Sequence, residues 1–185
     1  MLEMAEREKE LSKYRYLEHH NFYSDQKIRR ILRDVKTFAL VGASTVWRRP
    51  SYYAMTYLQH KGFRIIPINP ARVGETVLGE KVYGSLADVP HQLDMVDIFR
   101  TTEEALDITK DVIANKEERG IKYLWMQLTV RNDAAAELAE EVGLEVIMDR
   151  CPKIEFGRLS GELSWLGVNS GIISAKSLKS PKHGR

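Results

Sequence analysis

The stretch TFALVGASTVWRRPSYYAMTYLQHKGFRIIPI, residues 37–68, contains one complete strand–helix–strand unit. It opens with the apolar run TFALV, which is too short for a helix and ends at Gly42, so it predicts a buried strand. Pro50 suits the first turn of the helix that follows, and Gly62 suits the position just after its last turn. The run RIIPI at 64–68 predicts a second strand, although its proline weakens the case for an interior position in a sheet.

The same alternation continues on both sides of this unit. Further strands are expected at 95–100, 121–126 and 144–148, and further helices around 28–35, from Thr101 to Gly120 and from Asn132 to Gly143. Strands that are apolar on both faces and alternate with helices predict a parallel sheet covered on both sides. Right-handed crossovers then favour a doubly wound arrangement. The expected fold is α/β: a Rossmann-like, doubly wound parallel sheet of about five strands in a single domain with an N-terminal helical extension.

The domain boundaries are expected at two changes of composition. Residues 1–24 predict a polar helical extension with a thin apolar stripe, and 25–175 predict the Rossmann-like domain. Residues 150–175 include Trp165 and other apolar side chains, so this segment is expected to pack back on the domain. Residues 176–185 hold three Lys, one Arg and no acid, which indicates a solvated basic tail with weak anionic contact as the lesser alternative.

Composition argues against several classes of protein. The formal net charge of the 185 residues is only +2, so neither the global charge nor the arrangement of aromatic residues points to nucleic acid. No apolar run is long enough to span a membrane, and the charged N-terminus does not resemble a signal peptide, so the expected location is the cytoplasm. The N-terminal helix leaves open a homodimer or an unknown protein partner.

Metal and disulfide chemistry are not expected either. Cys151 is the only cysteine, which rules out an intrachain disulfide and a cysteine-based zinc site. The five histidines are scattered and include no H-x-x-x-H pair. No G-x-S-x-G elbow or P-loop is present. We therefore assign no catalytic residue and no metal ligand.

Ligands of open parallel sheets bind beyond the carboxyl ends of the strands, so the residues that follow the predicted strands are the candidate binding residues. They are Gly42, Ala43, Ser44, Arg48, Arg49, Pro50 and Ser51 after the first strand, Asn69, Pro70 and Arg72 after the second, Phe99 and Arg100 at the third, Gln127 after the fourth, and Asp149, Arg150 and Cys151 after the fifth. Five of them are arginines, which indicates an anionic ligand. The loop GASTVWRRPS opens onto a helix N-terminus, where backbone amides and the helix dipole suit a phosphate.

A nicotinamide dinucleotide fits this pattern poorly. The signature G-x-G-x-x-G is absent, because Ser44 and Trp47 stand at the second and third glycine positions. The acidic residue that would bind the ribose is also missing from the end of the second strand, where Asn69 and Pro70 stand instead.

Several motifs together carry a family resemblance: LVGAS, RRPSYYAMTYLQHKGFRIIPINP, GETVLGEKVYGSLADVP, DMVDIFR, YLWMQLTV and VIMDRCPKIE. In this order and spacing the chain resembles the small bacterial and archaeal CoA-binding proteins. These are similar to the N-terminal CoA-binding domain of the succinyl-CoA synthetase alpha subunit. The resemblance covers roughly residues 25–175.

The resemblance implies a role for most of the candidate residues. It implies that the Gly42-Ala43-Ser44 loop and the Arg49-Pro50-Ser51 turn hold phosphates, that Asn69-Pro70 and Arg72 line the nucleotide, and that Phe99-Arg100 and Gln127 flank the pocket. The chain departs from the family at Thr129, where glycine is usual, and at Phe156, where histidine is common. Arg150 and Cys151 follow the fifth strand directly, so we expect Arg150 to favour the thiolate and Cys151 to be able to form a mixed disulfide with CoA.

Two functions remain open on the sequence alone. The first is a non-catalytic carrier, sensor or regulatory module that binds coenzyme A or an acyl-CoA. The alternative is an enzyme, acting on a CoA thioester or using a nicotinamide cofactor on an atypical Rossmann loop.

Overall fold

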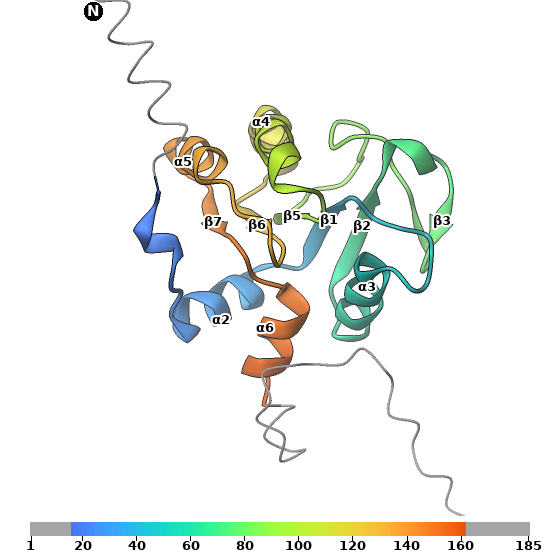
Figure 1. Cartoon of the computed structure of the whole chain (residues 1–185). Helices are drawn as coiled ribbons and strands as arrows, with labels where there is room; N and C mark the ends of the chain where they lie inside the picture. Colours follow the sequence, from blue (N-terminus) through green and yellow to red (C-terminus); the bar gives the residue numbers. More distant parts are fainter. Residues whose placement is uncertain (1–15, 162–185) are drawn as a thin grey trace, which may run out of the picture.

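The computed structural model describes residues 16–161, in which five parallel strands form the central sheet. The strands are β1 (Thr37–Val41), β2 (Arg64–Ile68), β5 (Met95–Ile98), β6 (Tyr123–Met126) and β7 (Glu145–Ile147). Their order in the sheet is β2-β1-β5-β6-β7 (Figure 1). The predicted Rossmann-like α/β fold is confirmed. The strand order reverses direction between β1 and β5, which is where ligands bind in such sheets.

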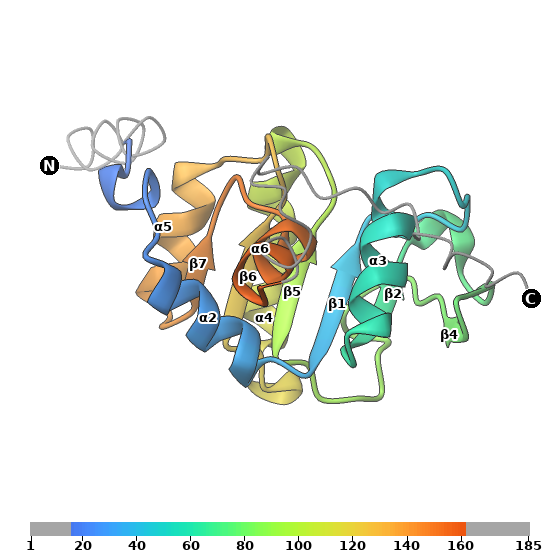
Figure 2. The ribbon, with the colours of Figure 1, turned by 90° about the horizontal axis from the view of Figure 1, so that it is seen from below.

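Helices cover both faces of the sheet. Helices α4 (Thr102–Arg119) and α5 (Asp133–Glu141) lie on one face, and α2 (Asp25–Asp34), α3 (Pro50–His60) and α6 (Pro152–Leu159) lie on the other, which Figure 2 shows from below. One apolar core lies on each side of the sheet, with side chains of α4 and α5 in the first and of α2, α3 and α6 in the second. The central strands are apolar on both faces because both faces are covered.

The helix ends follow the local sequence signals. Thr101 and Glu104 form the predicted capping box of α4, and Gly120 ends that helix in the left-handed conformation. The side chain of Asn132 caps α5 by accepting a hydrogen bond from the Ala135 amide at 3.0 Å. These caps fix where each helix begins, and therefore which residues remain in the loops that follow the strands.

Pro67 is accommodated because β2 lies at the edge of the sheet. A short hairpin of β3 (Thr76–Val77) and β4 (Glu80–Lys81), which we do not predict from the sequence, lies beyond this edge. The Tyr83 amide donates to the carbonyl of Pro67 at 3.0 Å. The chain after the hairpin thus covers the edge at the proline.

The N-terminal extension differs from the prediction in the part that the structure describes. Within residues 16–24 the structure contains the short 3-10 helix η1 (Glu18–His20) in place of the predicted polar α-helix. Leu17 is buried against the core, and its amide donates to Asp133 Oδ1 at 2.8 Å. This stretch therefore packs on the domain. Residues 1–15 and 162–185, including Trp165 and the basic tail, lie outside the described residues.

The stretch after β7 contains a helix that we do not predict. Helix α6 packs against α2 and α3, and its first turn lies next to the end of β7. None of the helices between residues 16 and 161 is both long and apolar enough to cross a bilayer.

Candidate functional site

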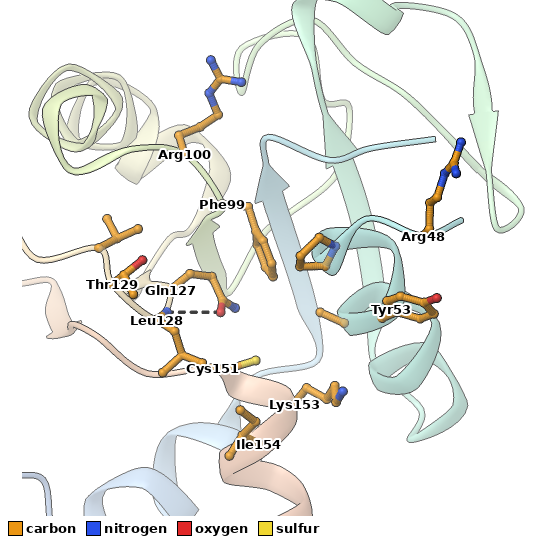
Figure 3. A pocket seen from close by; sticks show the side chains of 13 residues that line it. Arg48, Tyr53, Phe99, Arg100, Gln127, Leu128, Thr129, Cys151, Lys153 and Ile154 are labelled. Carbon is orange, nitrogen blue, oxygen red and sulfur yellow. Dashed lines mark hydrogen bonds between the residues drawn. The ribbon is translucent and has the colours of Figure 1, made fainter. Parts of the chain in front are cut away.

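A cavity of about 690 Å³ opens at the carboxyl ends of β1, β5, β6 and β7 (Figure 3). Its lining residues are Arg48, Pro50, Tyr53, Ala54, Phe99, Arg100, Gln127, Leu128, Thr129, Val130, Cys151, Lys153 and Ile154. The cavity lies where the strand order reverses, and its size is typical of a site for a cofactor. We take it as the candidate binding site.

Gly42 allows the loops after β1 and β5 to meet beside this cavity. Its φ of +93° is in the region that favours glycine. A Cβ at this position would lie 2.6 Å from the carbonyl oxygen of Phe99 and 2.7 Å from Cδ of Arg100. Gly42 is therefore needed for close packing of the two loops as well as for the turn.

Side chains that we expected at the ligand hold the loop after β1 in place. The Ser44 amide donates to Oγ of Ser51 at 3.1 Å, and Ser51 itself is buried. Nδ2 of Asn69 donates to the carbonyl of Ala43 at 2.7 Å, and Oδ1 of Asn69 accepts from the Ala71 amide at 3.0 Å. Ser51 and Asn69 thus shape the loop through bonds within the protein.

Two arginines of the predicted set line the cavity, Arg48 and Arg100. Figure 3 shows them at the outer part of the cavity, on opposite sides of Phe99. The Nε atom of Arg100 lies 3.1 Å from a carboxylate oxygen of Glu104, one helical turn away in α4. Two guanidinium groups at one rim can offer charge-assisted hydrogen bonds to an anionic ligand.

The other three arginines do not belong to the lining. Arg49 is the N-cap residue of α3. Arg72 forms an ion pair with Glu75 at 3.1 Å. Arg150 donates to the carbonyl of Asp149 at 2.7 Å, and its guanidinium lies 5.5 Å from the centre of the Tyr23 ring. Pro70 follows β2 and is likewise absent from the lining.

The inner end of the cavity has a polar floor. Asp97 in β5 is fully buried, and Nε2 of Gln127 donates to its carboxyl oxygens at 3.1 and 3.3 Å. Burial raises the pKa of Asp97 well above its usual range, against a smaller lowering by the Gln127 hydrogen bond. Burial of this carboxyl group therefore favours its neutral form.

Cys151 lies beside this floor, and one expectation about it is wrong. Burial raises the pKa of the Cys151 thiol, and the backbone hydrogen bonds of Ile154 and Lys153 lower it by less. Arg150 does not favour the thiolate, because its guanidinium lies over Tyr23. Burial also lowers the pKa of Lys153. The thiol therefore prefers to stay protonated.

Much of the apolar lining was not predicted from the sequence. Tyr53, Ala54, Leu128, Val130 and Ile154 complete the wall. Leu128 and Val130 lie in the loop just after β6, close to Gln127. The rule that selected Gln127, proximity to the carboxyl end of a strand, applies to them as well. Ile154 belongs to helix α6, which was not predicted. The local sequence signal for this helix is Pro152, because proline suits the first turn of a helix.

The two departures from the resembled family lie in different places. Thr129 lines the cavity and has a φ of +69°, a left-handed conformation that a β-branched residue rarely adopts. Phe156 is partly buried and packs against the core, with its ring centre 5.4 Å from that of Phe63. Only the departure at Thr129 touches the candidate site.

Comparison with known proteins gives concordant results. The model of a family described as CoA binding domain matches residues 36–157. The uncharacterized protein YneT of Bacillus subtilis (strain 168) is 31% identical over 131 residues, which cover 71% of this chain and 93% of that protein. Acetate–CoA ligase [ADP-forming] II of Archaeoglobus fulgidus is 32% identical over 96 residues, which cover 49% of this chain and 13% of the ligase.

A solved structure shares both the fold and part of the sequence. A hypothetical protein from Pyrococcus horikoshii OT3 superposes with a TM-score of 0.69 at 35% identity, covering 75% of this chain and 94% of that one.

Proposed function

This chain belongs to the CoA binding domain family, whose model spans residues 36–157, and on that basis we propose that it binds coenzyme A or an acyl-CoA in the cavity at the strand ends. The observation that carries the proposal is the arrangement of the lining: cations Arg48 and Arg100 at the outer part and apolar walls further in. Coenzyme A has the matching division, because its phosphates are at one end and its pantetheine arm and thiol at the other.

The loop after β1 would hold the phosphates, since its chain runs directly into the N-terminus of α3. Arg48 and Arg100 would add charge-assisted hydrogen bonds to the same phosphates. The pantetheine arm would pass Phe99 and Leu128, and the thiol or acyl group would approach Gln127 and Cys151.

We propose that the role is non-catalytic: a carrier, a sensor or a regulatory module. The polar groups at the inner end support this role. Burial raises the pKa of the Cys151 thiol, which disfavours the thiolate that a nucleophile would need. The similarity to an acetate–CoA ligase covers only 13% of that enzyme, and we do not extend its activity to this chain.

Calorimetric titration with CoA tests the proposal. A charge-assisted hydrogen bond contributes about 1.5–3 kcal/mol, so Arg48→Ala and Arg100→Ala should each weaken binding by about tenfold or more. Raising the salt concentration should weaken wild-type binding as well. Arg72→Ala and Arg150→Ala are matched controls, because both arginines lie outside the lining and should leave affinity unchanged.

Glu104→Gln should change the affinity for CoA in the opposite direction to the arginine variants. The Glu104 carboxylate is the ion-pair partner of Arg100, and a glutamine can still accept the hydrogen bond of the Thr101 amide. Releasing Arg100 should strengthen CoA binding. Unchanged affinity in both the Arg48→Ala and Arg100→Ala variants would show that the ligand does not use this cavity.

A further inference from the structure

His19, His20 and Glu140 form a cluster of potential metal ligands away from the cavity. The two histidines belong to η1 and Glu140 to α5, and one ligand atom from each lies within 4.8 Å of the others. Nε2 of His19 lies 3.1 Å from Oε2 of Glu140, and Nε2 of His20 lies 3.2 Å from Oε1. The carboxylate thus faces both imidazole nitrogens.

His20 has a buried nitrogen without a hydrogen-bond partner. Its side chain is completely buried, and Nε2 makes no hydrogen bond even though Oε1 of Glu140 is only 3.2 Å away. The contact is short, but it does not meet the geometry of a hydrogen bond. An unsatisfied buried polar atom is costly, and a cation between the nitrogen and the carboxylate would satisfy it.

The remaining contacts of His20 suit a metal ligand. Nδ1 lies 2.7 Å from the Tyr23 hydroxyl, which also accepts a hydrogen bond from the Met148 amide at 2.8 Å. Such outer contacts fix the orientation of the ring, as around other metal-bound histidines.

We propose that His19, His20 and Glu140 bind a divalent transition metal ion, best matched by Zn²⁺, which fastens η1 to α5. Two imidazole nitrogens and one carboxylate oxygen are a common zinc ligand set, with water at the fourth position. Mg²⁺ and Ca²⁺ fit less well, because they prefer sites made of oxygen atoms. The isolated sequence did not predict this site because Glu140 is 120 positions from His20 in the chain.

The surrounding charges limit the affinity. Lys27 and Arg131 are cations near His20, and they would repel a bound metal ion. Arg131 is paired with Asp133 at 2.8 Å, and the Lys27 ammonium lies 5.4 Å from the centre of the Tyr23 ring. The carboxylates of Asp133 and Glu140 offset these two cations, so we expect a weaker site than one built with thiolates.

Titration of the full chain, prepared without a polyhistidine tag, tests the site with two metals. Co²⁺ should give the visible absorption bands of a tetrahedral ion at one equivalent, and Zn²⁺ should displace it and raise the melting temperature. His19→Ala and Glu140→Gln should each reduce affinity at least about tenfold, the lower end of what loss of an outer-shell group alone produces. His60→Ala, at an exposed histidine of α3, is the matched control.

The test uses variants at His19 and Glu140 because both side chains are partly exposed, so their loss should leave the fold intact. His20→Ala is not used, because it removes a buried ring. Absence of Co²⁺ and Zn²⁺ binding by the wild-type protein would overturn the proposal. Binding that is undiminished in both His19→Ala and Glu140→Gln would overturn it equally. Neither result bears on CoA, since the three residues do not line the cavity.

Discussion

Nε2 of Gln127 lies 3.1 Å from Oδ2 of Asp97, and this hydrogen bond joins the loop after β6 to a buried carboxyl in β5. Burial raises the pKa of Asp97 well above its usual range, and the unfolded chain has an ordinary pKa of about 3.9. The folded protein therefore binds a proton that the unfolded chain releases. The stabilising contribution is complete below the unfolded pKa and is lost as the pH rises toward the folded pKa.

Asp97→Asn should remove this pH dependence. An asparagine can still accept the Gln127 hydrogen bond but does not titrate, so the variant should lose less stability than the wild type as the pH is raised from 5 toward the folded pKa. The slope for one proton is at most about 1.4 kcal/mol per pH unit. Melting temperatures of both proteins across this range give the answer. Burial lowers the pKa of His20 in both proteins, so its effect cancels in the difference. Parallel curves would contradict the prediction.

Gly42→Ala should destabilise the protein and weaken CoA binding. The left-handed backbone costs a residue with a Cβ about 1–2 kcal/mol, and the new atom would also meet the Phe99 carbonyl at 2.6 Å. Gly62→Ala is the matched control, since Gly62 has a φ of +92° with nothing within 4 Å of an added Cβ. Denaturant unfolding should show a clearly larger loss for Gly42→Ala than for Gly62→Ala. Equal losses in the free energy of unfolding would mean that the close approach of the two loops does not contribute to the cost of Gly42→Ala.

Thr129→Gly should stabilise the protein. Thr129 has a φ of +69°, and relief of this conformation should outweigh the entropic cost of a glycine, for a net gain of about 0.5–1 kcal/mol. Thr129→Ala retains a Cβ and should give no such gain. Urea unfolding of the two variants separates these cases. Stabilisation by alanine equal to that by glycine would point to the threonine side chain and not to the backbone.

The sequence was sufficient for the framework of the fold because its signals are local. Short apolar runs marked the five strands, and capping residues such as Thr101 and Asn132 marked the helix starts. Helix α6 has eight residues and no capping side chain, which left little local signal. The β3–β4 hairpin is formed by strands of two residues each, too short to show a period.

The site was only partly predictable, because the sequence gives the residues near the strand ends but not the directions of their side chains. Phe99, Arg100, Gln127 and Cys151 were predicted near the strand ends, and all four line one cavity. Arg150, next to Cys151 in the chain, turns toward Tyr23 instead. The family resemblance implies that Arg49 is at the phosphates, but the structure brings its neighbour Arg48 into the lining and leaves Arg49 out of it.

Cys151 should react slowly with CoA disulfide at neutral pH and faster as the pH rises. Its thiolate would attack one sulfur of CoA disulfide, form a Cys151–CoA disulfide and release the second CoA as a thiolate. Burial raises the pKa of the thiol, so the reactive form is scarce at pH 7. Intact mass after timed incubation should show one CoA adduct that a reductant removes, and Cys151→Ser should show none because the chain has no other cysteine. No adduct at any pH would contradict the predicted mixed disulfide between Cys151 and CoA.

The ligand preference should be CoA over NAD. A helix N-terminus can bind the pyrophosphate of either molecule, so the difference must come from other groups. An NAD site needs a carboxylate after the second strand to bind the ribose hydroxyls, and the segment Asn69–Arg72 contains no acid. Such a carboxylate would repel the 3′-phosphate of CoA, whereas the arginines near the cavity can attract it.

Thermal unfolding with each ligand measures this preference. A ligand that binds only the folded state stabilises it by RT ln(1 + [L]/Kd), which is about 2.7 kcal/mol at a hundredfold excess over Kd. CoA should therefore raise the melting temperature clearly, dephospho-CoA less, and NAD little or not at all. The order of CoA and dephospho-CoA reports on the 3′-phosphate alone, because the two molecules are otherwise identical. Arg48→Ala and Arg100→Ala together should narrow the gap between them if these guanidinium groups meet that phosphate. If NAD shifts the melting point as much as CoA does, the nucleotide preference argued from the end of β2 is wrong.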